Sequence, residues 1–271
     1  MSTSSLQRDS AVVLVDGPSE AVEGSTFRYS ANISGSWWIV NGPNGGFIAA
    51  VVARAVMAAA GSPRRGLRTL HVQYLRRPAE GPCEVTVEVI RAGRSVSFVR
   101  CGVTQDGRGL VSATASLAEA FDAPSFDEID PAAFEGWPAA EELLPNTITG
   151  PFEIPMHQHY DYRSCVSGPM TVGGWLRFRD DDALDECGLI AMTDAWWPPV
   201  IAEGHRFDRP MGVPTIDLTI HLRRRPPAGT NWVQAVYSSP LAEDGYLTER
   251  AQLWVPGVGL VAESIQLAIL R

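Results

Sequence analysis

Three polar side chains in the second half of the chain have the chemistry to activate a water molecule. Asp194 supplies a carboxylate that can take a proton from water as a general base. Thr215 and Gln266 can hold that water, because a hydroxyl both donates and accepts a hydrogen bond and a carboxamide offers two donors and an acceptor. Each residue also has a plain structural explanation: an aspartate that ends a helix, a threonine that begins a strand, and a glutamine at a strand edge. The three are 21 and 51 residues apart, so only the fold can bring them together.

An internal duplication singles these residues out. The segment Leu70–Gly81 aligns without gaps on Leu218–Gly229 at an offset of 148, and Gly109–Ala118 aligns on Gly259–Ala268 at an offset of 150, with five of ten positions identical. At these offsets Asp194 corresponds to Gly46, Thr215 to Leu67 and Gln266 to Ser116. Residues that differ between two copies of one scaffold are candidates for function added to it.

Each copy combines one helix with four or five strands. Alternation of apolar and polar residues predicts the strands, and an alanine-rich helix follows the glycine-rich turn Asn41–Gly46. In the first copy we expect strands over Thr26–Ser34, Arg68–Leu75, Cys83–Ala92, Ser95–Thr104 and Leu110–Leu117, and a helix that runs through Met57 to Ala60. In the second we expect strands near Val172–Phe178, Thr215–Leu222, Trp232–Ser238, Tyr246–Trp254 and Leu260–Ile269, and a helix from about Asp185 to Ala195. This order predicts an α+β fold with antiparallel sheets, in which helix and strands pack together and the three polar side chains can converge.

Composition changes sharply between the two copies. The segment Glu119–Tyr160 contains six prolines, nine acidic residues and no arginine, as expected for a connector that crosses the surface. We therefore predict an N-terminal domain over residues 1–118, an acidic, proline-rich linker over 119–160, and a C-terminal domain over 161–271 that carries the candidate catalytic residues.

Charge and hydrophobicity exclude several classes of protein. The formal net charge of -9 argues against nucleic-acid binding, which depends on neutralising phosphates. The longest apolar run, Phe47–Ala60, is interrupted by Arg54 and is too short to span a membrane, and the polar start of the chain lacks the apolar region of a secretory signal. We expect a cytoplasmic protein without a membrane partner.

Common metal and cofactor motifs are missing from the sequence. The four cysteines form no Cys-x-x-Cys pair, and no phosphate-binding glycine loop, nucleophile elbow or His-Glu-x-x-His motif occurs. All 22 basic residues are arginines, which removes any Schiff-base lysine. His157 and His159, followed by Asp161, could hold a metal from one strand face, but ordinary surface histidines explain them better. We expect neither a metal nor a cofactor.

Several motifs together resemble the double hot-dog acyl-CoA thioesterases of the bacterial type II class. They are Leu75-Arg-Arg-Pro, Ile90-Arg-Ala-Gly-Arg-Ser and Val111-Ser-Ala-Thr-Ala-Ser in the first copy, and Met192-Thr-Asp-Ala, Pro214-Thr-Ile-Asp and Glu263-Ser-Ile-Gln in the second. The resemblance covers most of the chain outside the N-terminus and the linker. It implies two tandem hot-dog repeats, each a long helix wrapped by an antiparallel β-sheet, with the site between them. It also implies that Asp194, Thr215 and Gln266 are catalytic, and that Gly46, Leu67 and Ser116 leave the first copy silent. One departure is Trp196-Trp197-Pro198-Pro199, where the family has a more aliphatic stretch.

The same resemblance suggests how an acyl-CoA substrate is held. Gly45 and Gly46 would begin the first helix, where backbone N–H groups could polarise a thioester carbonyl, although glycines there could also just permit a tight turn. Trp196 and Trp197 could line an acyl pocket or pack the helix end. Arg76–Arg77 and Arg223–Arg225 could meet the phosphates of CoA, or be solvated charge at strand ends.

Three functions remain open on the sequence alone. The first is a hydrolase in which Asp194 activates water and acyl-CoA is converted to a carboxylic acid and CoA without a covalent intermediate, since no activated serine or cysteine is evident. The second is a non-catalytic module that binds an acyl or polyketide thioester. The third, a hot-dog enoyl-CoA hydratase, needs a histidine five residues after the aspartate, where this chain has Pro199. For any of them we expect a homo-oligomer that pairs through exposed sheet or helix faces.

Overall fold

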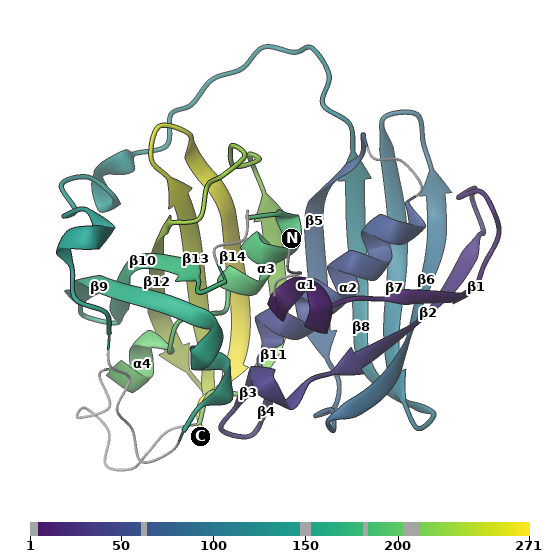
Figure 1. Ribbon diagram of the computed structural model, residues 1–271, viewed down its shortest axis with the longest axis horizontal. Coiled ribbons are helices and arrows are strands. Elements are labelled where there is room, and N and C mark those ends of the chain that lie inside the picture. Colours follow the sequence, from purple (N-terminus) through teal and green to yellow (C-terminus); the bar gives the residue numbers. More distant parts are fainter. Residues whose placement is uncertain (1–4, 61–63, 147–152, 181–183, 203–211) are drawn as a thin grey trace.

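The computed structural model describes residues 5–60, 64–146, 153–180, 184–202 and 212–271 (Figure 1). The first half contains α1 (Ser5–Asp9), β1 (Val13–Asp16), β2 (Thr26–Ile33), β3 (Trp38–Ile39), β4 (Gly42–Pro43), α2 (Gly45–Ala59), β5 (Gly66–Tyr74), β6 (Gly81–Ala92), β7 (Val96–Gln105) and β8 (Arg108–Ala118). The second half contains β9 (Tyr160–Gly168), β10 (Thr171–Phe178), α3 (Glu186–Met192), α4 (Pro199–Ala202), β11 (Thr215–Leu222), β12 (Val233–Glu243), β13 (Tyr246–Val255) and β14 (Gly259–Ile269).

Twelve of these strands form one antiparallel sheet, in which the strands of the second half repeat those of the first half in mirrored order. The order is β1-β2-β6-β7-β8-β5-β11-β14-β13-β12-β10-β9, so each strand of the first half has a counterpart at the mirrored place in the second. The halves join where β5 pairs with β11, with Leu70 opposite Ile220 and Val72 opposite Leu218. The predicted duplication is thus also a duplication of topology, and the two copies lie side by side (Figure 1).

Strand positions follow from the alternating pattern of the sequence. In β2 every second residue is buried, and the predicted strands agree with the observed ones to within a few residues except at β12, which continues to Glu243. Two hairpins turn at Asp-Gly pairs with positive φ, Asp106–Gly107 between β7 and β8 and Asp244–Gly245 between β12 and β13. A two-residue turn with both φ values positive matches the twist of antiparallel strands, and Asp-Gly adopts it readily.

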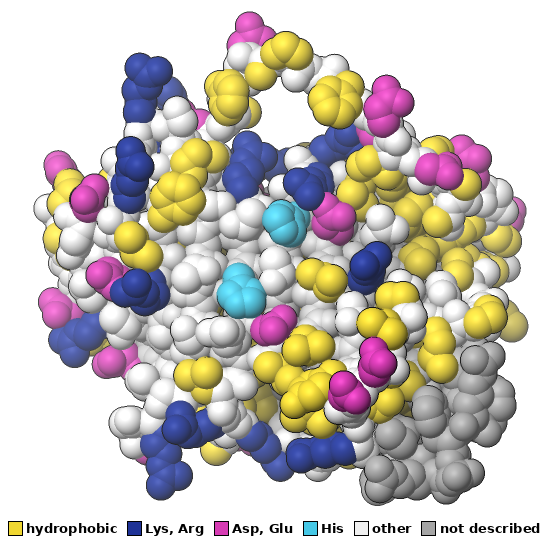
Figure 2. Space-filling view, turned by 180° about the vertical axis from the view of Figure 1, so that it is seen from behind, with side chains coloured by type: hydrophobic (Ala, Val, Ile, Leu, Met, Phe, Trp, Pro, Cys, Tyr) yellow, Lys and Arg dark blue, Asp and Glu magenta, His cyan; other side chains and the backbone are white. Residues whose placement is uncertain are grey.

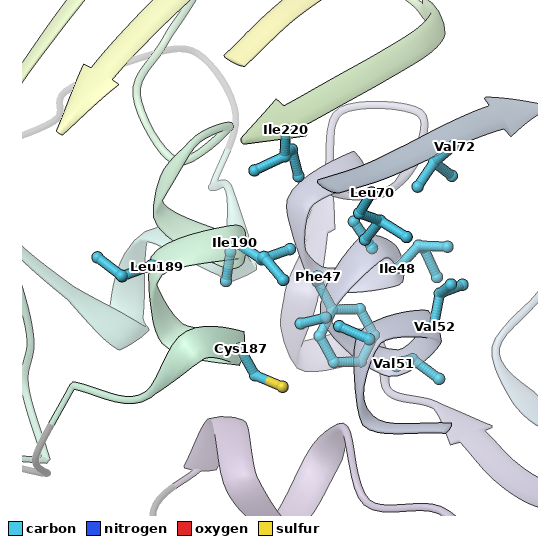
Figure 3. Packing of buried hydrophobic residues seen from close by; sticks show 14 of the residues in the cluster. Phe47, Ile48, Val51, Val52, Leu70, Val72, Cys187, Leu189, Ile190 and Ile220 are labelled. Atoms are coloured by element: carbon cyan, nitrogen blue, oxygen red, sulfur yellow. The ribbon is translucent and has the colours of Figure 1, made fainter. Parts of the chain in front are cut away.

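Two helices, α2 and α3, lie on one side of the sheet and pack on each other (Figure 1). Asn44 caps α2 by accepting the Phe47 N–H at 2.9 Å, and Asp185 caps α3 by accepting the Gly188 N–H at 2.7 Å. Figure 3 shows residues of α2 and α3 meeting side chains of β5 and β11 in one apolar cluster. The two helices run antiparallel. Asp194, just after the end of α3, accepts a hydrogen bond from Gly46 at the start of α2, while Asp185 at the start of α3 pairs with Arg54 late in α2.

The second helix is shorter than expected. The prediction of a helix to Ala195 is wrong, because α3 ends at Met192. The Thr193 hydroxyl donates to the Ile190 carbonyl at 2.7 Å, and the Asp194 and Ala195 N–H groups bond carbonyls three residues earlier, which tightens the chain into a turn. The prolines at 198 and 199 cannot donate to a continuing helix.

The repeat offset also differs between helices and strands. The helix caps Asn44 and Asp185 correspond to each other at an offset of 141, rather than the 148 of the aligned strands. Asp194 therefore corresponds by position in the helix to Ala53 and not to Gly46. Gly46 is instead its contact partner across the two copies, where the Gly46 N–H donates to the Asp194 carboxylate.

Residues 119–146 and 153–159 connect the two copies. They contain the short 3₁₀ helices Pro131–Ala133, Ala140–Glu142 and Pro155–His159, and Figure 1 shows the first part arching over the open end of the sheet. Phe134 anchors this segment by stacking on Trp254, with ring centroids 5.1 Å apart. Within the described part of the chain, no helix is long and apolar enough to cross a membrane.

The two histidines at the end of this connector fit neither explanation: they do not lie on a strand, as the metal-site interpretation assumed, and His159 is not a surface residue. Both belong to a 3₁₀ helix, and His159 is buried and stacks on Trp37 with ring centroids 4.0 Å apart. Burial lowers the pKa of His157 to about 4. The His159 ring helps to attach the connector to the first copy, whereas the His157 ring contacts Tyr162 of β9.

Candidate active site

Asp194 lies where the end of α3 meets the start of α2. Its Oδ2 accepts the Gly46 N–H at 2.9 Å and an Asn44 side-chain N–H at 3.0 Å, and its own carbonyl accepts from Asn44 Nδ2 at 2.7 Å. A carboxylate is stabilised at a helix N-terminus because unpaired N–H groups and the positive end of the helix dipole face it. The two copies therefore share this junction, with the acid from one and the helix start from the other.

Glycine is required at the start of α2 by the closeness of Asp194. A Cβ atom at Gly45 would lie 2.9 Å from Asp194 Oδ2, and one at Gly46 would lie 2.6 Å from the Ala191 carbonyl oxygen. The Tyr74 hydroxyl donates to the Gly45 carbonyl at 2.7 Å and fixes the same turn from β5. Any larger residue would push the two helices apart.

The other two candidate residues lie next to Asp194 in one hydrogen-bonded row. Gln266 Nε2 donates to Asp194 Oδ1 at 3.3 Å, and Gln266 Oε1 accepts from the Thr215 hydroxyl at 3.0 Å. The pairing of β11 with β14 places Thr215 opposite Ala268, two residues beyond Gln266. The structure thus brings together all three residues that the sequence singled out.

Burial makes Asp194 a weaker acid than a free aspartate. It raises the pKa of this carboxyl from 3.8 to about 6, and the hydrogen bonds from Gly46, Gln266, Asn44 and Gly45 oppose the rise. Residue 194 as a whole is of intermediate burial. Its Oδ1 accepts the bond from Gln266 at 3.3 Å, which is longer than the two bonds to Oδ2, so this oxygen has the greater capacity to accept a proton.

Glu249 on β13 is a fourth polar residue of this site, and the sequence analysis missed it. Gln266 Nε2 donates to Glu249 Oε1 at 2.7 Å, and the glutamate is only 3% exposed. Burial, together with the nearby Asp194 charge, raises the pKa of Glu249 to about 8. The sequence carries a signal for it: Glu249 stands between Leu247 and Ala251 on the inward-facing side of an alternating strand, where an apolar residue is expected.

The N–H groups of Gly45 and Gly46 were expected to meet a substrate carbonyl. In the structure they serve Asp194 instead: the Gly46 N–H bonds its carboxylate, and the Gly45 N–H also lowers the pKa of that group. The start of α2 therefore stabilises the ionised form of the candidate base.

The tryptophan pair after Asp194 belongs to an aromatic cluster. Trp196 is buried, with its ring 5.2 Å from Tyr162 and 5.9 Å from Tyr237, whereas Trp197 remains partly exposed and lies 5.0 Å from Trp196. Of the two explanations left open, packing describes Trp196. Trp197 packs against Trp196 and Tyr162 and stays partly exposed.

The arginines expected near CoA phosphates differ between the clusters. Each member of the second cluster pairs with a carboxylate of this chain: Arg223 with Glu263, Arg224 with Asp127, and Arg225 with Glu186. In the first cluster Arg76 donates to the Gly109 carbonyl at 2.8 Å. Figure 2 shows arginine side chains gathered toward the ends of the strands on the face behind the helices. Among the residues that the structure describes, no group of three or more His, Cys, Asp or Glu side chains could hold a metal ion.

Comparison with protein families finds two matching models. The acyl-CoA thioesterase N-terminal domain matches residues 34–118, and the acyl-CoA thioesterase C-terminal domain matches residues 126–270. The comparison with curated proteins gives no significant match.

Solved structures confirm the double hot-dog fold. A protein with a hot-dog fold from Alicyclobacillus acidocaldarius is 20% identical, with 100% of this chain and 99% of that chain covered and a TM-score of 0.84. A putative thioesterase II from Thermobifida fusca YX is 22% identical, with 98% and 97% covered and a TM-score of 0.80. An acyl-CoA thioesterase II from Mycobacterium marinum is 19% identical, with 98% of each chain covered and a TM-score of 0.75.

Proposed function

This chain belongs to the acyl-CoA thioesterase family, and on that premise we propose that it hydrolyses acyl-CoA to a carboxylic acid and free CoA by direct attack of water. The observation that supports this mechanism is the row of hydrogen bonds from Thr215 through Gln266 to Asp194. It joins a general base to two groups that can hold its water, at a place where both copies meet.

In this mechanism Asp194 is ionised and its Oδ1 takes a proton from water as the water oxygen attacks the thioester carbon. A tetrahedral oxyanion forms, and its collapse breaks the carbon–sulfur bond. The proton held by Asp194 then passes to the departing thiolate, which leaves as CoA, and the base is restored. General-base assistance of this kind contributes roughly 10² to 10⁴ in rate.

Gln266 and Thr215 act by position. Gln266 donates toward Asp194 Oδ1, so it stands beside the water that this oxygen would bind. Thr215 fixes the amide through its bond to Gln266 Oε1, and its own hydroxyl oxygen can still accept a bond. Alignment of the attacking water is worth several orders of magnitude in related intramolecular reactions.

An acyl-enzyme route through cysteine is disfavoured by burial. It raises the pKa of Cys83 and of Cys165 to about 11 and that of Cys101 to about 12, and it also raises the pKa of Cys187. A thiol attacks as its thiolate, which these surroundings suppress at neutral pH.

We assign Trp197, which is partly exposed, to contact with the acyl group, because it follows the base Asp194 by three residues in the chain.

The deciding experiment follows thiol release from acyl-CoAs of graded chain length. The wild type should turn over at least one of them, and Asp194→Asn should lose roughly 10² to 10⁴ in kcat. Asp122→Asn, a matched change at an exposed site in the connector, should behave as the wild type. Equal rates for Asp194→Asn and wild type would remove Asp194 from the mechanism, and tight acyl-CoA binding without thiol release would identify a binding module instead.

A further inference from the structure

The amide of Gln266 faces two carboxyl groups at once. Its Nε2 lies 2.7 Å from Glu249 Oε1 and 3.3 Å from Asp194 Oδ1, and a carboxamide nitrogen carries two protons. Each carboxyl group can therefore accept one of them. The shorter of the two bonds goes to Glu249, which the mechanism above does not use.

Glu249 lies in the core, at a position where packing alone would favour an apolar side chain. Its strand neighbours on the same face are Leu247 and Ala251, both buried, and the glutamate itself is 3% exposed. A carboxyl group in such a place is unfavourable unless hydrogen bonds compensate. Its bond to Gln266 is such a compensation.

The first copy lacks this pair as well as the base. In the sheet Glu249 pairs with Gln266, which lies opposite Leu218; in the first copy Leu70 lies opposite Ala115, and at this mirrored place Val99 pairs with Ala115. Both of these residues are apolar and buried. Glutamate and glutamine thus occur together only in the copy that carries Asp194.

We propose that Glu249 is a positioning residue of the thioesterase site, which accepts one amide proton of Gln266 so that the other points at Asp194 and the carbonyl oxygen points at Thr215. This role rests on the proposed function of Gln266. It extends the site by one residue behind the row of Asp194, Gln266 and Thr215.

Thr215 alone does not fix the amide, and Asp194 accepts only one of its two protons, through a long bond of 3.3 Å. A threonine hydroxyl donates or accepts with equal ease, so Thr215 bonds the amide in either of its two orientations. Without Glu249 one amide proton would be buried with no acceptor, and such a group favours any rearrangement that pairs it. Glu249 offers an acceptor oxygen whether or not it carries a proton, so the positioning does not depend on its ionisation.

The first test is a double-mutant cycle on acyl-CoA hydrolysis. Glu249→Leu should lower kcat by about 10- to 100-fold with KM within about twofold of wild type, which is the scale expected when a group in the site is displaced. Glu249→Gln keeps an acceptor oxygen and should restore kcat to within about threefold. In a Gln266→Ala background, Glu249→Leu should have no further effect, because the residue acts through the amide. Glu243→Leu, an exposed change at the end of β12 beside the turn into β13, serves as the matched control.

Three results would overturn the proposal: wild-type kcat in Glu249→Leu, a Glu249→Gln variant as slow as Glu249→Leu, or losses that multiply in the double variant. Thermal unfolding of each variant separates a folding defect from these outcomes.

A second measurement reads the amide without any turnover. The side-chain N–H pair of Gln266 can be assigned in a ¹⁵N-correlated NMR spectrum as the pair that Gln266→Ala removes. In wild type both protons should resist exchange with solvent, and Glu249→Leu should expose one of them while Glu243→Leu changes neither. If the wild type hydrolyses no acyl-CoA but this pattern holds, the proposed function fails and the positioning contact stands; a freely exchanging pair in the wild type refutes the contact itself.

Discussion

Replacing Asp194 by asparagine should make the folded protein more stable at neutral pH while removing its activity. Burial raises the pKa of this carboxyl from 3.8 to about 6, which means that folding disfavours its ionised form. Asparagine has nearly the same shape and no charge to desolvate. A group retained for catalysis at the expense of stability behaves in this way.

The size of the effect follows from the two pKa values. A change from 3.8 to about 6 corresponds to on the order of 3 kcal/mol, at about 1.36 kcal/mol for each pH unit. Below pH 3.8 the carboxyl is protonated in both the folded and the unfolded chain and contributes nothing. Above pH 6 it is ionised in both, and the full penalty applies. The stability advantage of Asp194→Asn should therefore grow by on the order of 2 kcal/mol between pH 4.5 and 7.5.

Other contributions leave this trend intact. The new asparagine N–H₂ group faces the Gln266 N–H, a mismatch that costs about 1 kcal/mol at every pH. Loss of the Asp194 charge also eases ionisation of Glu249, whose pKa that charge raises, and so it strengthens the trend. The pH dependence is therefore a better readout than the stability at any single pH.

Urea unfolding of wild type, Asp194→Asn and Asp122→Asn at a series of pH values measures this directly. The free energy of unfolding of Asp194→Asn should rise relative to both other proteins as the pH increases. Parallel curves for all three, or a wild type that gains on the variant toward pH 7.5, would show that Asp194 is not held in an unfavourable charged state.

Three further predictions concern the same junction. The kcat of the wild type should fall about tenfold per pH unit below pH 6, because Asp194 must be ionised to act as a base, and a pH–rate profile checks this. Gly46→Ala should lower the free energy of unfolding by about 1–3 kcal/mol and lower kcat as well, because its Cβ would lie 2.6 Å from the Ala191 oxygen. Gly102→Ala, whose Cβ would meet nothing closer than 3.9 Å, should change neither quantity. Urea unfolding and thiol-release assays measure the two. Asn44→Ala removes a helix cap and a bond that lowers the pKa of Asp194, so unfolding should become easier by about 1–2 kcal/mol and the acid limb of the profile should move to higher pH.

Much of the fold could be predicted because the sequence contains two copies of the same pattern of strands and helix. Alternation in β2 and the Asp106–Gly107 turn are local signals, and the repeated segments around Leu70 and Leu218 reveal the duplication. The end of α3 could not be predicted, because it depends on a hydroxyl of Thr193 that turns back to its own helix. A helix-forming pattern alone does not report such a competing bond.

Three residues of the candidate site could be predicted, but their hydrogen-bond partners could not. Asp194, Thr215 and Gln266 stood out by duplication and by resemblance, yet the acceptor for the Gly46 N–H was taken to be a substrate oxygen and is Asp194. Glu249 was missed because no motif includes it, although an acid at an inward strand position is itself a warning that a polar network lies behind it.

The two helix ends of this fold give two junctions of similar geometry, and their side chains explain why one of them is the candidate site. At one junction Asp194 meets the uncharged cap Asn44 and keeps an oxygen for water. At the other the cap is itself an acid, Asp185, and Arg54 pairs with it at 3.0 Å while also donating to Ser10 of the N-terminal segment at 3.1 Å. A guanidinium stays protonated and cannot act as a base, and its ion pair satisfies the carboxylate that could have done so. After the duplication the two junctions thus diverged, and the one with Arg54 and Asp185 now serves as a structural contact between the copies. A substrate analogue should accordingly bind this chain with a stoichiometry of one.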